Sequence, residues 1–534
     1  MFRLNERTRP WWTLLEACGG LFVLMLDSTA LGLALPDLQR DLNASAEALQ
    51  WVQNAYLLSM AVLVVTLSRL GDIYGRRRIY LLGTFVFGAG AILCALAWAP
   101  AVLVAGRVIQ GAGGAAMLGL SLALASNAFS DADRPRALGI WTTISAIALA
   151  VGPLVGGLLI ASVSWRAIFW LCVPVCVVGF AITAWAAPES RDESAGTELD
   201  WPGLAALSIG LTAVVLALVQ GKGWGWGSAA TLGTFVGGVA MLAVFWVVEH
   251  RVRHPIMEFP LFRNRPYLGA TAAAFALVGA YWGVMFFQPQ YLQNILGYSV
   301  IVAGLLVLPI TVPMVLFSQA STKVIERVGV RITMTAGMVC GAAGTLWLTQ
   351  IGPGTTYAGG LLPGYLLFGI SLALVYTPMS TAAMAAMPRE KAGIAAGVLG
   401  MNRLMAGALV LALMGAVFLH IQTDDVTQAL EQRAGPATAI EKRDIDALLA
   451  GSPEAKAAVA ALPPAPRAAV NVAAGDAFTD ALSSSMWIVV VLVVHVSRPP
   501  ILRPFVQGLV SLDEKAGVAG SYPSVSDQAN IRTT

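Results

Sequence analysis

The feature that most constrains this chain is a series of long apolar runs separated by short polar loops. A segment needs roughly 17–25 mainly apolar residues to cross a bilayer as a helix, because lipid leaves every backbone group to be satisfied within the protein. Fourteen runs meet or approach this length, the last of them only weakly. They cover residues 12–35, 46–68, 79–99, 101–127, 136–161, 165–187, 203–220, 229–248, 267–289, 299–319, 331–351, 359–385, 392–419 and 483–497. The sequence therefore predicts an all-α polytopic membrane protein with fourteen transmembrane helices.

Composition agrees with a membrane protein and excludes several other classes. The 534 residues are 57% hydrophobic and only 12% charged, whereas soluble domains contain about 25% charged residues. The net charge is +3 and the basic residues lie between apolar runs, so nucleic-acid binding is not expected. There is no Gly-Lys-Ser/Thr phosphate loop and no zinc-ligand spacing among the four histidines. We therefore expect no ATP hydrolysis, no metal, no cofactor and no enzymatic activity.

The distribution of Lys and Arg orients the helices. Cytoplasmic loops of polytopic proteins carry an excess of these residues, and here they gather before the first run and after the second, fourth, eighth, tenth and twelfth. Both termini are therefore expected in the cytoplasm, with residues 1–11 and 498–534 as tails, the second partly disordered. The first run is too long for a cleaved signal peptide, so we interpret it as a retained helix.

A short polar pattern occurs twice, eight runs apart, and indicates an internal repeat. Residues 68–78 read SRLGDIYGRRR and residues 322–331 read TKVIERVGVR. Each has an acid, a glycine three residues later and then basic residues: Asp72, Gly75, Arg76 and Arg77 in the first, Glu326, Gly329 and Arg331 in the second. Parallel six-helix repeats form a known transporter architecture with its substrate site near the middle of the membrane.

The repeat predicts two six-helix bundles, residues 12–187 and 267–497, separated by a linker, residues 188–266, that adds two transmembrane helices. The second bundle includes a polar, Ala-rich loop at 420–482 on the outer face, where we expect a small helical excursion.

Five motifs carry a resemblance to a known family. They are LDSTALGLALP (26–36), SRLGDIYGRRR (68–78), AGRVIQGAGGAA (105–116), VGPLVGG (151–157) and QYLQNILGYSVIVAG (290–304). In this order and at these depths, they resemble the major facilitator superfamily, specifically its fourteen-helix drug:proton antiporter branch. The resemblance implies the major facilitator fold, partners that are the lipid bilayer, protons and a small-molecule substrate, and location in the cytoplasmic membrane.

The resemblance also implies roles for two of these motifs. The loops at Asp72 and at Glu326 would bias gating between conformations, although their arginines set the topology in any case. Gly152, Pro153, Gly156 and Gly157 form the antiporter motif, which marks exporters rather than importers. The alternative is a generic seam of small residues for helix packing.

Two charged residues lie deep inside apolar runs. Asp27 lies roughly 20 Å from the start of the first run at about 1.5 Å per residue, where a carboxylate costs about 2.5–3.5 kcal/mol on insertion scales. Arg107 lies within the fourth run and also needs a partner, unless it reaches the outer surface by snorkelling. In the family such an Arg is associated with proton transfer, so Asp27 and Arg107 are the candidates for coupling proton to substrate. The branch usually has Asn where this chain has Gly32.

Other polar and aromatic residues are weaker candidates. Glu16 lies near the inner end of the first run, where the cytoplasmic interface can solvate it. The candidates for lining a cavity, in part through cation–π contact with the ligand, are Gln53, Asn54, Tyr56, Gln110, Trp141, Tyr376 and Arg403.

The last apolar stretch departs from the pattern. MWIVVVLVVHVSRPP offers barely a dozen apolar residues before His495 and Arg498, which is short of a full span. Either this helix extends back through FTDALSSS or the final span is compromised.

These features favour a secondary transporter that exports small amphipathic or apolar compounds in exchange for protons by alternating access. An exporter of one endogenous metabolite, such as an antibiotic, a siderophore or an amino acid, is the first alternative. A non-transporting membrane scaffold or sensor is the second.

Overall fold

The computed structural model describes residues 8–130, 133–191, 198–252, 255–352, 354–387, 392–434, 461 and 464–497. Within these residues every regular element is a helix. Thirteen helices are long and apolar enough to cross a membrane, and a fourteenth span results if the bent pair Val300–Leu306 and Leu308–Phe317 is counted as one. The predicted all-α polytopic fold is confirmed.

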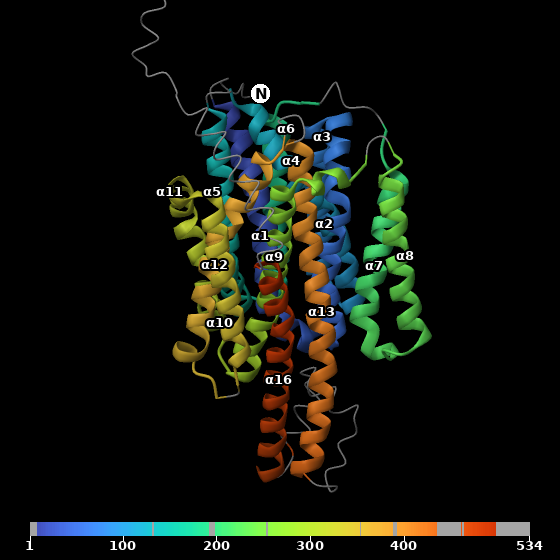
Figure 1. Ribbon diagram of the computed structural model, residues 1–534, viewed down its shortest axis with the longest axis vertical. Coiled ribbons are helices and arrows are strands. Elements are labelled where there is room, and N and C mark those ends of the chain that lie inside the picture. The colour runs from blue at the N-terminus through green and yellow to red at the C-terminus, as the bar shows by residue number, and fades with distance from the viewer. Residues whose placement is uncertain are drawn as a thin grey trace, which may run out of the picture.

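The first six helices and the two additional helices follow the predicted runs closely. They are α1 (Arg9–Leu42), α2 (Ala46–Tyr74), α3 (Arg76–Ala95), α4 (Pro100–Ala128), α5 (Arg134–Ser162), α6 (Arg166–Ala186), α7 (Trp201–Trp224) and α8 (Ala229–Glu249). In Figure 1 the pair α7–α8 lies at one side of the molecule, and α7 packs against α2 and α13.

The remaining elements form the second half. They are η1 (Phe259–Arg263), α9 (Arg265–Gln290), η2 (Tyr291–Ile295), α10 (Val300–Leu306), α11 (Leu308–Trp347), η3 (Leu348–Gln350), η4 (Tyr357–Leu361), α12 (Leu362–Ala385), α13 (Ala392–Ala434) and α16 (Pro464–Ser497). The halves meet along α1 and α9, α2 and α13, and α5 with α10 and α11.

Helix starts are set by local chemistry, because the first N–H groups of a helix have no intrahelical acceptor. At five of the helix starts within the described residues, a side chain just before the helix accepts one of these N–H groups. The five are Ser45 (α2), Asp200 (α7), Ser228 (α8), Asn264 (α9) and Ser299 (α10). Proline occupies the first turn of several others, including α1, α4 and α5.

The repeated polar loop has the same backbone feature in both halves. Gly75, between α2 and α3, has φ +116°, and Gly329, inside the long element α11, has φ +82°. L-residues with side chains rarely adopt such angles, whereas glycine does so freely. The helical conformation is therefore interrupted at the corresponding glycine of each loop. The long element α11 consists of two helices, one before and one after Gly329.

The final helix resolves the two alternatives left by its short apolar stretch. α16 begins at Pro464 and runs through FTDALSSS, so the span expected at 483–497 is longer than predicted. Two of its hydroxyls donate to carbonyls one turn earlier in the helix, Thr479 to Gly475 at 3.0 Å and Ser485 to Ala481 at 2.7 Å, whereas Ser483 donates to the carbonyl of Thr349. These internal bonds let polar residues continue the helix.

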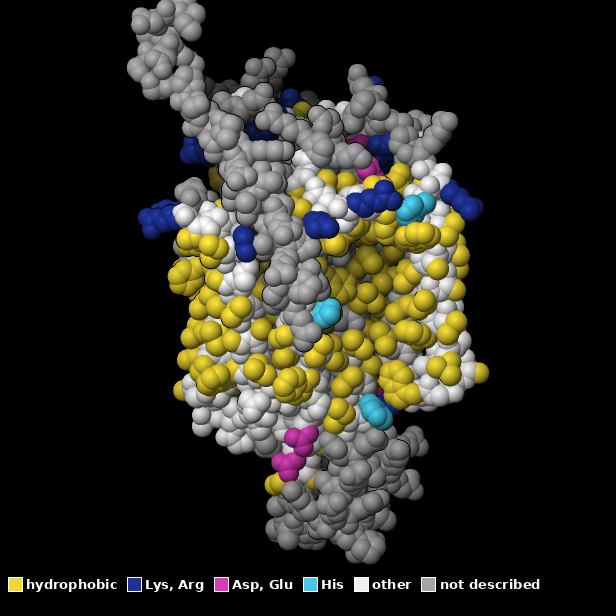
Figure 2. Space-filling model, in the orientation of Figure 1, with side chains coloured by type: hydrophobic (Ala, Val, Ile, Leu, Met, Phe, Trp, Pro, Cys, Tyr) yellow, Lys and Arg dark blue, Asp and Glu magenta, His cyan; other side chains and the backbone are white. Residues whose placement is uncertain are grey.

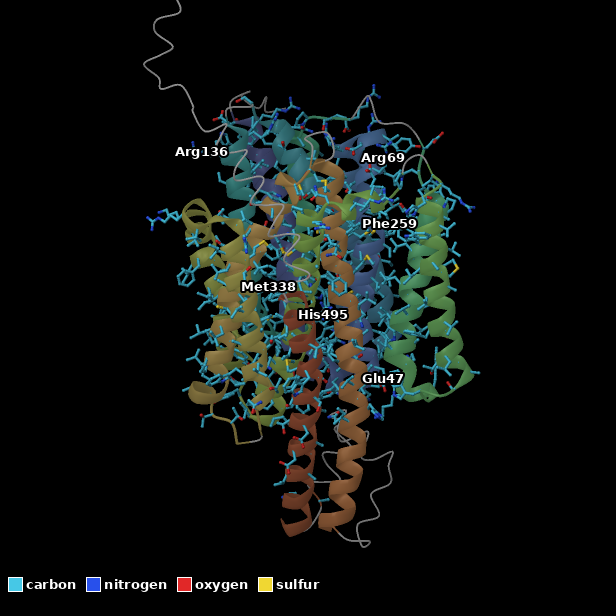
Figure 3. All side chains as sticks on the ribbon, viewed as in Figure 1. Glu47, Arg69, Arg136, Phe259, Met338 and His495 are labelled. Carbon is cyan, nitrogen blue, oxygen red and sulfur yellow. The ribbon has the colours of Figure 1, made fainter. Side chains whose placement is uncertain are left out.

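The polar loop expected at 420–482 is helical at both of its described ends. α13 continues to Ala434, and Figure 1 shows α13 and α16 extending side by side beyond the other helices. Figure 3 shows His495, close to the end of α16, about half-way along the bundle instead of beside Arg69 and Arg136 at its rim. The expected C-terminal tail, 498–534, lies outside the described residues.

The surface is divided as a membrane protein requires. Figure 2 shows a broad band of apolar side chains, with Lys and Arg gathered along one rim of the band. Figure 3 places Arg69 and Arg136 toward that end and Glu47 toward the other. This multi-pass architecture agrees with the alternation of Lys and Arg in the loops.

Candidate functional site

Asp27 and Arg107 form an ion pair at the centre of the first half. Asp27 is on α1 and Arg107 on α4, and 2.5 Å separate Oδ2 of Asp27 from Nη1 of Arg107. Both side chains have no exposed surface. An unpaired charge at this depth would be very costly, so each residue explains how the other is tolerated. The snorkelling alternative for Arg107 is wrong.

Residues of α2, α4 and α6 hold the guanidinium of Arg107 in place. Nε donates to the carbonyl of Val52 on α2 at 3.2 Å, and Nη1 also donates to Oε1 of Gln110 on α4 at 2.8 Å. The guanidinium lies over the Tyr56 ring, 4.0 Å from its centroid, with Phe169 of α6 at 5.8 Å. Tyr56 and Gln110, predicted as cavity residues, thus contact the ion pair directly.

The pair retains unused hydrogen-bonding capacity. Oδ1 of Asp27 and Nη2 of Arg107 are buried with no partner among the described residues. The same holds for both amide atoms of Asn54 and for Nε2 of Gln53, which are also on α2. Buried polar atoms are normally satisfied, so this region has capacity for further hydrogen bonds or a proton.

The predicted antiporter motif of α5 packs directly against the helix that carries Asp27. An added Cβ at Gly156 would lie 2.5 Å from Cβ of Ala30, and one at Gly152 would collide with the hydroxyl of Thr29. Both contacts are within about one turn of Asp27. On the other side of α5, Gly157 and the carbonyl of Pro153 face α10 of the second half. The motif is therefore a seam that joins the Asp27 helix to the interface between the halves.

The packing around Gly32 explains why a residue with a side chain, such as the Asn usual in the branch, does not fit at this position. A Cβ at Gly32 would run into the carbonyl oxygen of Met285 on α9. The absence of a side chain lets α1 and α9 approach backbone to backbone. A polar neighbour for Asp27 is lost here, and a close contact between the halves is gained.

The halves are in contact on the side of Asp27 away from the Lys- and Arg-rich rim. Nε2 of Gln293 donates to the carbonyl of Leu33 at 3.1 Å, and Gly415 of α13 packs against the Gln50 side chain. The lining of the small pocket left there comes from both halves and is mostly polar and aromatic: Gln39, Ala46, Leu49, Gln50, Phe286, Phe287, Gln290, Asn294, Phe418, Gln422 and Phe478.

The loop between α2 and α3, predicted to bias gating, is bound to the end of α6. Asp72 accepts from Nε and Nη2 of Arg76 at 2.8 and 2.7 Å. The backbone N–H of Arg77 donates to Glu189 at 3.1 Å, and its guanidinium donates to the carbonyl of Ala184. Glu189, which also lies 3.6 Å from Arg78, was not predicted. The sequence does contain a signal for this contact: Glu189 is an acid just after an apolar run, and it falls on the same side of the membrane as the loop with three consecutive arginines.

The second loop shares the glycine but not a described ion pair. Gly329 has the positive φ given above, and its carbonyl accepts from the Thr333 hydroxyl at 2.9 Å. Arg331 is exposed, and the side chain of Glu326 lies outside the described residues.

The remaining cavity candidates do not join the ion pair. Arg403 of α13 lies over the Tyr376 ring of α12, 4.7 Å from its centroid, and donates to Ser380 at 2.5 Å. They form a separate cluster in the second half. Trp141 packs near Leu14 and Cys18 at the inner part of α1.

Glu16 is more enclosed than its place in the sequence indicates. It is only 5% exposed, and its Oε1 accepts from the Tyr80 hydroxyl of α3 at 3.1 Å. Gly20 on α1 and Gly179 on α6 leave room for the carboxyl group. Solvation from the interface, expected from sequence, is not what the structure has. Among the described residues no cluster of three or more potential metal ligands occurs.

Comparisons with known proteins agree with this architecture. The family model described as Major Facilitator Superfamily matches residues 17–411. The multidrug resistance protein Stp of Mycobacterium tuberculosis is 36% identical over 406 residues, covering 76% of this chain and 75% of that protein. The tetracenomycin C resistance and export protein of Streptomyces glaucescens is 33% identical over 441 residues, covering 82% of each.

The fold is also similar to solved structures. A bacterial homologue of the human lysosomal transporter Spinster, in an inward-facing and unoccupied conformation, gives a TM-score of 0.59 at 16% identity, covering 94% of this chain and 98% of that one. The resemblance drawn from the motifs is confirmed. On the extent of the family match and the identity to these relatives, the chain belongs to the Major Facilitator Superfamily.

Proposed function

We propose that this protein is a proton-coupled exporter of small amphipathic or apolar compounds that works by alternating access. The observation that carries the proposal is the Asp27–Arg107 pair, fully buried and 2.5 Å apart, with Oδ1 of Asp27 and Nη2 of Arg107 unpartnered among the described residues. Support for export of drugs comes from the relatives, whose names describe multidrug resistance and antibiotic export.

The pair offers a simple way to couple a proton to a conformational change. A proton on Asp27 removes the charge that attracts Arg107, so proton binding and the ion pair compete. Arg107 also contacts α2 through Val52 and Tyr56, so releasing it from Asp27 alters the packing of three helices. In this scheme the two protonation states of Asp27 favour different conformations, and a ligand that prefers one state exchanges for the proton.

The gating loop supplies the second part of the scheme. The contacts of Arg77 with Glu189 and Ala184 connect the α2–α3 loop to the end of α6. These exposed and half-exposed contacts are individually weak. They can therefore break and re-form as the first half changes its orientation.

We place the Lys- and Arg-rich rim in the cytoplasm, with both termini on that side of the cytoplasmic membrane. We propose no role for ATP or nucleic acid. Labelling of single cysteines at Arg69 and Glu47 with a membrane-impermeant maleimide in intact cells tests the orientation. Only the cysteine at position 47 is expected to react from outside.

The functional test is substrate-dependent proton flux in liposomes that contain the purified protein. Asp27→Asn should abolish proton movement driven by an exported drug. Asp37→Asn, at a solvent-accessible carboxylate paired with Arg40, is the matched control and should transport normally. Coupled antiport by the Asp27→Asn protein would refute the role of Asp27. No flux with any member of a broad drug panel would favour the metabolite exporter or the scaffold.

A further inference from the structure

A pair of buried carboxyl groups lies away from the Asp27–Arg107 pair, at the ends of the two additional helices. Asp200 immediately precedes α7 and Glu249 is the last residue of α8, and they are 8% and 5% exposed. Oδ1 of Asp200 accepts from the N–H of Gly203 at 2.7 Å, and Oε2 of Glu249 accepts from the N–H of Met257 at 2.9 Å. One oxygen of each carboxyl group is thus held by a backbone donor.

The other two oxygens converge. Oδ2 of Asp200 and Oε1 of Glu249 are both buried and have no donor among the described residues. Both lie over Gly203: the position of an added Cβ there is 2.8 Å from Oε1 of Glu249 and nearer still to Oδ2 of Asp200. Gly203 has no side chain that could separate the two carboxyl groups, which are within side-chain hydrogen-bond range of each other. Two acceptors that face each other need a proton or a cation between them.

Neither carboxyl group has an ion pair with a Lys or Arg among the described residues. The ionisable groups that lie nearest to the pair along the chain or at this end of the neighbouring elements include Glu198 before α7, Arg69 on α2, His250 and Arg251 after α8, and Glu258, Arg263 and Arg265 around η1. His250 is exposed and stacks on Phe259, with its Nδ1 2.7 Å from the carbonyl of Trp246. Two like charges this close in a buried site cannot both persist.

We propose that Asp200 and Glu249 form a proton-binding site in which one carboxylic acid donates its O–H to the other carboxylate. The single bound proton comes from water and returns to water when it is lost. The site joins the start of α7, the end of α8 and, through Met257, the segment that leads into the second half. Proton binding therefore fastens the additional helices to the connection between the two halves. This inference does not depend on the proposed transport function.

The test is the pH dependence of thermal unfolding, followed by tryptophan fluorescence of the purified full-length protein in detergent. The Tm of the unmodified protein should fall between pH 6 and pH 9 by roughly 2–4 °C more than that of Glu249→Gln. Glutamine keeps an acceptor for the Met257 N–H and permanently donates to Asp200, so it reproduces the protonated pair at every pH. Asp200→Asn should behave likewise, because Asn also caps helices well.

Asp37→Asn serves as the control, since it removes a solvent-accessible carboxylate, and it should keep the pH dependence of the unmodified protein. Equal pH dependence in all four proteins would overturn the proposal. A Tm at pH 8 that rises with Mg²⁺ or Ca²⁺ and loses this response in Glu249→Gln would also overturn it, because the site would then hold a metal cation. If Glu249→Gln does not fold, Asp200→Asn still decides between these results.

Discussion

The Asp27–Arg107 pair makes a quantitative prediction about stability that is separate from transport. Both side chains are fully buried and their charged atoms are 2.5 Å apart. Removing one partner of a buried pair costs about 3–5 kcal/mol, because the remaining charge is uncompensated. For Asp27→Asn we expect the lower end, about 3 kcal/mol, since the amide oxygen still accepts from Arg107. Arg107→Gln should cost roughly 1–3 kcal/mol, because a proton can neutralise the Asp27 that remains.

The double variant, Asp27→Asn with Arg107→Gln, isolates the energy of the interaction between the two residues from the energy of their contacts with the rest of the protein. With both charges removed, the two introduced amide side chains can bond to each other. The double variant should therefore cost about 2 kcal/mol less than the sum of the single ones, within the range for contacting residues. SDS-induced unfolding of the purified protein in detergent measures all three. The double variant should regain stability without regaining transport.

The solvent-accessible pair Asp37–Arg40 provides the matched control for this cycle. Its side chains are 28% and 55% exposed, so the same substitutions there should give a coupling of only about 0.2–1 kcal/mol. If the Asp27 and Arg107 variants are additive within about 0.3–0.5 kcal/mol, the buried pair does not contribute as reasoned above.

Two further predictions concern the motifs. Gly156→Ala should lower both stability and transport, at a cost of roughly 1–3 kcal/mol, because its Cβ would lie 2.5 Å from that of Ala30. Gly157→Ala, whose nearest neighbour would be 3.1 Å away, should cost clearly less; a larger effect at 157 in thermal unfolding would contradict the packing described. Asp72→Asn removes a partly exposed bond to Arg76 and should change stability by only about 0.2–1 kcal/mol. Its initial transport rate in liposomes should nevertheless fall severalfold, and an unchanged rate would exclude a gating role.

Much of the fold could be predicted because the bilayer imposes a simple rule on length and polarity. Helix α8, for instance, begins where the predicted run begins and ends one residue beyond it. The end of the chain was harder, because FTDALSSS has the polarity of a loop. Hydroxyl bonds to the preceding turn, such as Ser485 to Ala481, are invisible to hydropathy and let the helix continue.

The candidate site was predictable in its members but not in its contacts. Asp27 and Arg107 each stood out as charges in apolar runs, yet only the packing of α1 against α4 shows that they are partners. For Glu16, the sequence gives no sign that the side chain is enclosed. Its place near the start of α1 follows from the sequence, but Tyr80 and Gly179, which enclose it, come from helices far along the chain.

The two halves are in contact on the side of Asp27 away from the Lys- and Arg-rich rim, and the nature of this contact affects the rate at which that end opens. Gly32, Gly157 and Gly304 each press against a main-chain carbonyl of the opposite half, those of Met285, Val300 and Pro153. Side chains at an interface can yield gradually by changing rotamer, but main chains in direct contact have no such freedom. Opening at this end should therefore be a single-barrier event, and dwell times in single-molecule fluorescence should follow one exponential. A glycine-to-alanine substitution at any of these three positions would then shorten the time that the protein spends with this end closed. It would not add a fluorescence level between those of the closed and open conformations.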